Sequence, residues 1–363
     1  MNKLTRLNTF LSDQQLDIAF IQDPATIRFF TNYSTDPHER VVSLVVAPDK
    51  TPLLFVPSLE AKMAKEAEPN FTIVSYQDHE NPYQLLTEAI IREFNTPKTC
   101  AIEKKYVTLF TAEQLKIFLP ELVFATDLTD FVNMERIIKT PEQIALLKES
   151  GKFADLAMKV GVDSLQVGIS EVEVVAKIEY EMKKVGISHM SFDTMVLFGD
   201  HAADPHGEPG TRTLKENELV LFDLGTMYKG YASDMTRTVY FGHEIKAFDQ
   251  EIHQIVQEAH DLAMKAVKPG MTAEQIDAIA RTHIEKAGYG DYFIHRLGHG
   301  IGQSCHEFPS IMSGNTLVLQ EGMCFSIEPG IYIPGKVGVR VEDCVVVTKD
   351  GCISFTNAPS YTA

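Results

Sequence analysis

Two stretches of the sequence repeat the same order of features, and this repeat constrains the fold more than any other property of the chain. Segments 167–186 and 269–288 both carry a glycine, a serine or threonine two residues later, an amphipathic helical pattern and a closing glycine, 102 residues apart. The pentapeptide DLAMK precedes both copies, at 155–159 and 261–265. A serine or threonine just before such a pattern is typical of a helix N-cap. The repeat predicts two related halves, each of two helices plus antiparallel strands, that pair about a pseudo-twofold axis.

Each copy is followed by a predicted hairpin with an acidic residue at the end of an apolar strand, FDLG at 222–225 and SIEPG at 326–330. The first such stretch, Val220–Thr238, has the pattern of two strands joined by a turn near 228–230. Asp223 ends the first arm, and Asp234 lies on the returning arm. A buried carboxylate is costly without a cationic partner, and two that face each other take up protons unless a cation keeps both ionised. The pattern therefore predicts a metal site.

The second copy supplies the further ligands. His299 lies between two glycines in GHGIG, and Glu328 ends an apolar strand just before a Pro-Gly turn. Arg340 and Glu342 share one face of the strand in GVRVEDCVVV by the period-two rule. Taken alone, His299 could be a satisfied core histidine, and Arg340 with Glu342 a surface ion pair. The glycine flanks and the apolar run at 345–347 favour a buried site instead.

Four carboxylates and one imidazole form a donor set that suits Mn²⁺, Co²⁺ or Zn²⁺. They are too many for one catalytic zinc, which takes about three protein ligands and a water. Two divalent ions bridged by carboxylates balance the charge, lower the pKa of water and polarise a carbonyl, which is the chemistry of hydrolysis. His206 and His306 are candidates for holding the substrate or protonating the leaving nitrogen. His201 and His295 are assigned structural roles.

The remainder of the chain predicts a smaller α/β domain before this region. All 22 glycines lie at Gly151 or later, so the first 150 residues contain no glycine-rich phosphate loop. We expect an N-terminal domain over 1–130 and a C-terminal domain over 131–363. In the first, apolar runs predict strands at Ile18–Ile21, Val41–Val46, Leu53–Val56 and Phe71–Val74, and amphipathic patterns predict helices at Tyr83–Phe94 and Thr111–Phe118.

Composition excludes several function classes. The net charge of -17 argues against a nucleic-acid partner, which needs a positive face. The N-terminus has no long apolar block, so we expect neither a signal peptide nor a membrane span. The five cysteines are odd in number and lack a C-x-x-C pair, which is typical of small buried thiols in an intracellular enzyme. We expect a cytoplasmic protein.

These motifs resemble those of the pita-bread metallopeptidases, and within them the proline dipeptidases (prolidases) and aminopeptidase P. The resemblance rests on FDLG, YASDMTRT, GHGIG, SIEPGIY and VRVEDCVVV, with His206 in PHG and His306 in HE. It covers the chain from about residue 134 to the end. The N-terminal region is similar in outline to a creatinase-type domain. The implied fold is an α+β pita-bread (creatinase/aminopeptidase) fold with an internal duplication, preceded by a smaller α/β creatinase-type domain.

The resemblance also implies roles for individual residues. Asp234 and Glu342 would bridge two metal ions, Asp223 would chelate one of them, and His299 with Glu328 would hold the other. Glu328 would also act as general base, with His206, His306 and Arg340 arranged around the tetrahedral intermediate. The family cleaves the bond before proline, whose tertiary amide nitrogen carries no N–H. We expect Mn²⁺, with Co²⁺ or Zn²⁺ as alternatives, and a small peptide substrate with proline at its second position.

The choice between dipeptidase and aminopeptidase P depends on the far end of the pocket. A dipeptidase must pair the proline carboxylate with a cation, for which Arg340 and Arg296 are candidates. In similar bacterial dipeptidases a loop of the partner subunit reaches the active site, and the loop containing Asp36, His38 and Arg40 fits this role in a homodimer. That loop also reads as a solvated turn. A creatinase-like or non-catalytic protein would lack several ligands, methionine aminopeptidase lacks the extra domain, and ester or organophosphate hydrolysis would be a side activity.

Overall fold

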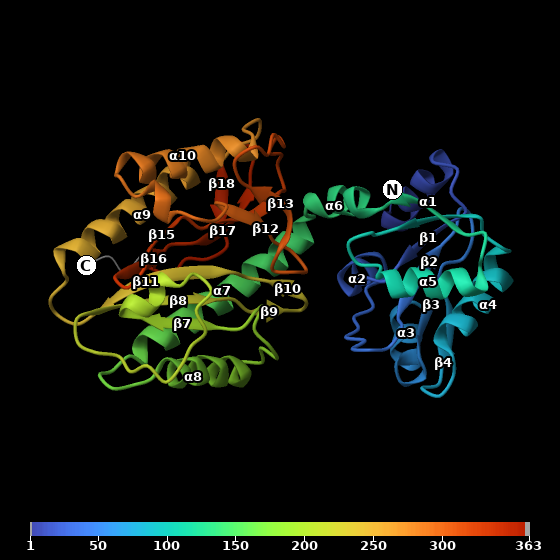
Figure 1. Cartoon of the computed structure of the whole chain (residues 1–363), viewed down its shortest axis with the longest axis horizontal. Helices are drawn as coiled ribbons and strands as arrows, with labels where there is room; N and C mark the ends of the chain where they lie inside the picture. The colour runs from blue at the N-terminus through green and yellow to red at the C-terminus, as the bar shows by residue number, and fades with distance from the viewer. Residues whose placement is uncertain (1, 360–363) are drawn as a thin grey trace. The chain divides into compact units, whose positions relative to one another are not determined.

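A computed structural model describes residues 2–359 of the chain. The chain forms two compact units, Met1–Glu135 and Arg136–Ala363. The expected boundary after residue 130 falls inside helix α6 (Thr129–Ile137), so the backbone passes from one unit to the next within a helix. Figure 1 shows the elements of each unit in chain order. In the described part of the chain, no helix combines the length and the apolar character needed to cross a membrane.

The N-terminal unit is built on a six-stranded mixed sheet in the order β4-β3-β2-β1-β5-β6. Alternate residues of β1 pack into different apolar clusters, Ala19 and Ile21 on one face and Ile18 and Phe20 on the other, so both faces are covered. Its elements are α1 (Lys3–Asp13), β1 (Ile18–Ile21), α2 (Pro24–Thr31), β2 (Ser43–Val46), β3 (Leu53–Pro57), η1 (Ser58–Glu60), α3 (Ala61–Ala67), β4 (Thr72–Tyr76), α4 (Pro82–Phe94), β5 (Thr99–Ile102), α5 (Leu109–Phe118), β6 (Val123–Asp127) and α6. The predicted strands and helices are confirmed, with ends that differ by a few residues.

The C-terminal unit holds its strands between two pairs of helices. In Figure 1, α9 and α10 cover one side of the strands and α8 the other. The unit contains a three-stranded sheet β11-β8-β7, a five-stranded sheet β13-β12-β14-β17-β18 and the pairs β15-β16 and β9-β10. Its elements are α7 (Pro141–Asp163), α8 (Glu171–Lys184), β7 (Met195–Phe198), η2 (Gly199–Ala203), β8 (Glu218–Leu224), β9 (Met227–Tyr228), β10 (Tyr231–Ala232), β11 (Met235–Phe241), α9 (Ala247–Ala266), α10 (Ala273–Lys286), η3 (Gly290–Tyr292), β12 (Gly298–Gly300), β13 (Glu307–Ile311), β14 (Cys324–Ile327), β15 (Gly330–Ile333), β16 (Val337–Arg340), β17 (Asp343–Val347) and β18 (Cys352–Ser354).

The internal repeat is visible in matching hydrogen bonds. Ser170 caps α8 and Thr272 caps α10, each in a capping box with the residue three positions later. The glycine before each cap has a positive φ, and its N–H donates to a carbonyl, Gly168 to Leu214 (2.9 Å) and Gly270 to Leu319 (3.0 Å). The predicted duplication is therefore confirmed at the level of individual backbone contacts.

The acidic hairpin of the first half also forms as predicted. Strands β8 and β11 pair antiparallel, which places Asp223 opposite Thr236, and the connection turns at Lys229–Gly230, where both residues have positive φ. The two arms approach closely beside Gly225, since a Cβ there would lie 1.9 Å from the carbonyl oxygen of Ser233. Only glycine fits this position, and the close contact holds Asp223 and Asp234 near each other.

Two details of the second half differ from the sequence-based expectation. The Pro329–Gly330 turn does not close a hairpin, because β14 pairs with β12 and β17 whereas β15 pairs with β16 in another sheet. The predicted continuous strand around Arg340 is broken at residues 341–342, between β16 and β17. There the N–H of Glu342 donates to the carbonyl of Thr236 (3.0 Å). The break thus joins Glu342 to the hairpin of the first half.

Replacing Gly225 by alanine should destabilise the protein by about 1–3 kcal/mol, the usual effect of forcing a methyl group into a packed site. Unfolding in urea, followed by circular dichroism, measures this change. Gly351→Ala is the matched control, because the nearest atom to a Cβ at Gly351 lies 3.8 Å away. Equal stability of the two variants would contradict the close packing of the hairpin arms.

Candidate metal centre

Five side chains from both halves meet at one end of the strands. Ligand atoms of Asp223, Asp234 and Glu342 all lie within 4.8 Å of one another, and so do those of His299, Glu328 and Glu342. Nε2 of His299 lies 3.4 Å from Oδ2 of Asp234 and 3.3 Å from Oε1 of Glu328. Glu342 belongs to both groups. A third set joins Asp234 and His299 to His306, so the structure brings together all five residues expected as metal ligands, in overlapping sets.

Three carboxylates of this cluster, those of Asp223, Glu328 and Glu342, resist ionisation. Burial, together with the neighbouring Asp234, raises the pKa of Asp223 to about 6 and that of Glu328 to about 7, although Arg340 and His299 respectively oppose the shift. Burial and the same Asp234 charge raise the pKa of Glu342 well above its usual value. A cationic group among these side chains would remove the repulsion between them.

Unpartnered atoms point to the same conclusion. Oδ1 of Asp223 and Oε1 of Glu342 are buried without a hydrogen-bond partner. Nδ1 of His299 lies 3.1 Å from the carbonyl of Gly300, which can only accept, so in the neutral imidazole this nitrogen carries the proton. The lone pair of Nε2 then faces the oxygens of Asp234 and Glu328, and these two carboxylates raise the pKa of His299 although its burial opposes the shift, so this position attracts a cation or a proton. Lone pairs that face one another in a buried site fit a bound cation.

Hydrogen bonds from neighbouring side chains fix the orientation of the acids. Thr236 donates to Oε2 of Glu342 (2.8 Å), and Ser326 donates to Oε1 of Glu328 (3.0 Å). Arg340 donates to Oδ2 of Asp223, to the hydroxyl of Tyr332 (2.8 Å) and to the hydroxyl of Thr236 (3.0 Å). The guanidinium of Arg340 is thus already engaged by the cluster.

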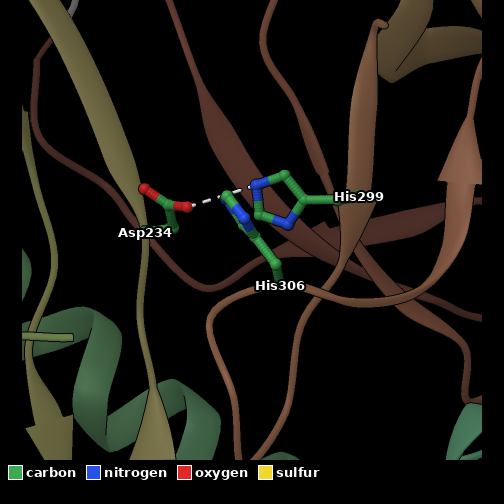
Figure 2. Close-up of side chains that lie close together, drawn as sticks. All are labelled: Asp234, His299 and His306. Carbon is green, nitrogen blue, oxygen red and sulfur yellow. Dashed lines mark ion pairs between the residues drawn. The ribbon is translucent and has the colours of Figure 1, made fainter. Parts of the chain in front are cut away.

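A pocket of about 1,020 Å³ opens onto these side chains, and its lining comes entirely from the C-terminal unit. The lining includes three further residues singled out from the sequence, His206, His306 and Arg296. His306 packs edge-on against His299 with ring centroids 4.0 Å apart, as Figure 2 shows beside Asp234. Burial and the nearby His299 lower the pKa of His306 to about 4, so its imidazole is neutral at pH 7.

The other two candidates from the sequence belong to the N-terminal unit. Asp36 and His38 lie on its loop before β2, with side chains 85% and 70% exposed. Arg40 of the same loop donates to Asp78 through Nε (2.9 Å). The pocket of the C-terminal unit does not include them, and their role in substrate binding stays a prediction.

Sequence reasoning missed two features of the pocket. Cys305, expected to be an inert thiol, donates to Oδ2 of Asp234 (3.1 Å) and lines the pocket. His295, expected to be structural, also lines the pocket, and its Nε2 lies 2.9 Å from the hydroxyl of Tyr332, a partner of Arg340. The position of Cys305 directly before His306 was the available signal, but nothing in the pattern gave its partner.

Comparisons with known proteins identify the family. The model of "Metallopeptidase family M24" matches residues 145–349, and that of the "Creatinase/Prolidase N-terminal domain" matches residues 3–139. The chain belongs to metallopeptidase family M24. It is 48% identical to an Xaa-Pro dipeptidase of Lactobacillus helveticus over 98% of this chain and 96% of that protein.

Solved structures of this family share the whole fold. The prolidase from Pyrococcus horikoshii superimposes with a TM-score of 0.91 at 32% identity and covers 99% of both chains. The X-Pro aminopeptidase from Thermotoga maritima superimposes with a TM-score of 0.86 at 29% identity, again over 99% of both chains. The pita-bread fold with a creatinase-type N-terminal domain is confirmed. As an M24 metallopeptidase the chain is a peptidase that uses divalent metal ions, and the carboxylate cluster fits such ions.

Stabilisation by Mn²⁺ should grow with pH. Without metal, the raised pKa values of Asp223 and Glu328 mean that their contribution to stability is full below pH 4 and is lost as the pH rises through 6 to 7. Bound Mn²⁺ favours the ionised forms, so its effect on Tm should be at least twice as large at pH 8 as at pH 5.5. Differential scanning calorimetry with and without Mn²⁺ measures this difference. Glu328→Gln should reduce it, and an effect of Mn²⁺ that is the same at both pH values would contradict the assignment.

Proposed function

We propose that this protein is an Xaa-Pro dipeptidase, which hydrolyses dipeptides with proline in second position and releases free proline. The observation that carries the proposal is the similarity to an Xaa-Pro dipeptidase over nearly the full length of both chains. It spans both units, so it includes the N-terminal creatinase-type domain as well as the cluster. We place the domain division close to residue 130, as expected from the sequence.

The metal ligands in this proposal are Asp223, Asp234, His299, Glu328 and Glu342. A pair of divalent ions is supported by the overlapping ligand sets, in which Glu342 and Asp234 each belong to two sets, so these two acids would be the ones shared between the ions. The donors are four carboxylates and one imidazole, a hard, oxygen-rich set, which favours Mn²⁺ over the softer preference of zinc for thiolate and imidazole. When bound, the ions lower the pKa of water and polarise the scissile carbonyl.

Residues of the chain then move the protons. Glu328 acts as general base toward the attacking water, and its hydrogen bond from Ser326 holds the carboxylate in position. His306 is neutral at pH 7 because its pKa is about 4, so its ring can donate a hydrogen bond to the oxyanion that develops on the substrate. His206, which also lines the pocket, passes a proton to the departing proline nitrogen. An amide nitrogen leaves only after it has gained a proton, and this proposal assigns that proton transfer to His206.

Two arginines have the remaining roles: one positions groups at the site, and the other binds the carboxylate of the substrate. Arg340 holds Asp223 and Tyr332 and stays close to the tetrahedral intermediate as a positioning charge. Arg296 donates to Ser310 through Nη1 (3.0 Å) and lines the pocket, so we assign it to the carboxylate of proline. An ion pair with the substrate carboxylate would be bidentate and would select dipeptides over longer chains.

We further propose a cytoplasmic homodimer. All five cysteines are free, and three of them, Cys100, Cys324 and Cys344, are buried, which suits a reducing compartment. In the dimer, the loop with Asp36 and His38 of one subunit would close the pocket of the other. Support for this comes from the high exposure of both side chains.

Aminopeptidase P activity is the second candidate, because the X-Pro aminopeptidase from Thermotoga maritima shares the complete fold. The two activities differ in whether the pocket accepts a residue after proline. A cation at the position of Arg296 disfavours such a residue by recognising the free carboxylate.

Substrate length should separate these activities. The Mn²⁺-loaded protein should cleave Leu-Pro at least about 100-fold more efficiently, in kcat/KM, than Leu-Pro-Gly, because a longer peptide leaves the charge of Arg296 unpaired. Treatment with EDTA should abolish both activities, and Mn²⁺ should restore them. Arg296→Met should lower this preference for dipeptides mainly through KM. Release of leucine from the tripeptide at the higher efficiency would instead establish aminopeptidase P activity.

The proposed loop contribution has its own test. The double variant Asp36→Asn/His38→Asn should raise KM for Xaa-Pro dipeptides about tenfold or change the selectivity among them, with Tm shifted by less than about 2 °C, because surface substitutions rarely affect stability. Asp13→Asn/His79→Asn is the control, since these two residues are also exposed in the same unit. A kinetic profile like that of the control would reject a role for the loop.

A further inference from the structure

A buried polar network that the proposed reaction does not use lies beside the metal-binding acids. Its centre is Arg237 of β11, which is 3% exposed. Its Nη1 donates to the backbone carbonyl of Glu342 (2.6 Å) and to that of Thr236 (3.0 Å). Its Nη2 donates to Oδ1 of Asp343 (2.8 Å) and, like Nε, to the carbonyl of Ala358 (3.0 and 3.2 Å). One guanidinium therefore ties the strand of a bridging acid to the C-terminal segment.

The network includes residues of both copies of the DLAMK repeat. The proposed reaction gives this repeat no role. Asp155, the first residue of one copy, accepts hydrogen bonds from the N–H groups of Asn357 (2.7 Å) and Ala358 (2.9 Å). Asp261, the first residue of the other copy, lies 3.2 Å from Nδ1 of His260. Nε2 of His260 in turn lies 3.3 Å from Oδ2 of Asp343. The two aspartates of the repeat thus lie at opposite ends of one chain of polar contacts, which is buried at Arg237, Asp343 and His260 and reaches the surface at Asp261.

The network holds the backbone of Glu342 at a point where pairing between strands does not. Glu342 lies in the break between β16 and β17, outside the ladder of either strand. Its N–H is held by the carbonyl of Thr236 and its carbonyl by the guanidinium of Arg237, so neighbouring residues of β11 fix both of its peptide groups. Because Thr236 also donates to the carboxylate of Glu342, β11 sets the position of the whole residue. Loss of Arg237 would free the carbonyl of Glu342 and remove the guanidinium from the buried carboxylate of Asp343, which would keep its contacts with His260 and Thr356.

We propose that Arg237 is a positioning residue for Glu342, and that the C-terminal segment Thr356–Ala358 is a latch that sets the metal affinity of the site. Contacts at both ends of this segment, Thr356 and Ala358, hold it in place. Ala358 binds Arg237 and Asp155, and the hydroxyl of Thr356 donates to Asp343. Metal binding and docking of the latch favour each other, because both require the same position of Glu342. The proposal rests on Glu342 being a metal ligand, as in the proposed function.

Mn²⁺ binding to the full-length protein tests the latch, measured by isothermal titration calorimetry. Two Mn²⁺ ions are expected to bind, and Arg237→Gln should raise the Kd of the more weakly bound one by about 10- to 100-fold. This is the usual effect of losing a residue that orients a metal ligand. Arg237→Lys should recover part of this loss, because it keeps the charge. Asp155→Ala touches only the latch and should raise Kd about three- to tenfold. Asp163→Ala, an exposed aspartate on the same helix, should leave Kd within twofold.

A second measurement separates positioning from general stability. Ile284→Ala removes a fully buried side chain outside the network and should lower Tm without changing the Kd for Mn²⁺. In the wild-type protein, the amides of Asn357 and Ala358 should exchange with deuterium at least about fivefold more slowly when Mn²⁺ is bound. Unchanged Kd values for Arg237→Gln and Asp155→Ala, or equal exchange with and without Mn²⁺, would overturn the proposal. Because these tests need no peptide substrate, they stay separate from a failure of the Xaa-Pro assignment, which would appear only in the wild-type activity panel.

Discussion

Mutual repulsion among four carboxylates, two of them buried and two nearly so, is the constraint on which the rest of the structure depends. Asp223, Asp234, Glu328 and Glu342 lie within reach of common ligand positions, and among residues 2–359 the groups that form ion pairs with them are Arg340 and His299. The offset is incomplete, since burial and the charge of Asp234 still raise three of the pKa values. The cluster is therefore stable in its ionised form only with divalent cations, and a metallopeptidase site follows from electrostatics as well as from family membership.

The duplicated architecture explains how so much like charge is held in place. Asp223 lies within strand β8, and Asp234, Glu328 and Glu342 each lie directly beside the end of a strand, so antiparallel pairing of the neighbouring residues limits how far the acids can relax away from one another. The halves are then joined at single points, such as the contact of Glu342 with Thr236 and the hydrogen bonds of Arg340 to Asp223 and Thr236. A shift of one half against the other would separate the two ligand sets. The contacts that hold the halves together therefore also hold the candidate metal ligands together.

Features of this arrangement that depend on neighbouring residues could be predicted from the sequence. Contacts between residues far apart in the chain could not. Asp223 and Asp234 could be recognised because acids at the ends of apolar strands break a local rule, and the caps at Ser170 and Thr272 follow from neighbouring residues. The break at 341–342 could not be recognised, because the alternation of side chains between the two faces of a strand does not show where that strand changes its pairing partner. Arg237 was equally hidden, since its carbonyl partner at Ala358 lies 121 residues away.

Arg340 and Arg296 show how the structure separates residues that the sequence treats alike. Both are cations near ligand motifs, and both were candidates for the proline carboxylate. The guanidinium of Arg340 is nearly buried and bonded to Asp223, Thr236 and Tyr332, so a substrate carboxylate would have to displace Asp223. Arg296, within the described residues, makes a single side-chain hydrogen bond, to Ser310, and keeps donors for the pocket. Since Arg296 lies three residues before His299, one short segment would then position both the carboxylate of the substrate and a metal ligand, which fixes the length of peptide that fits between them.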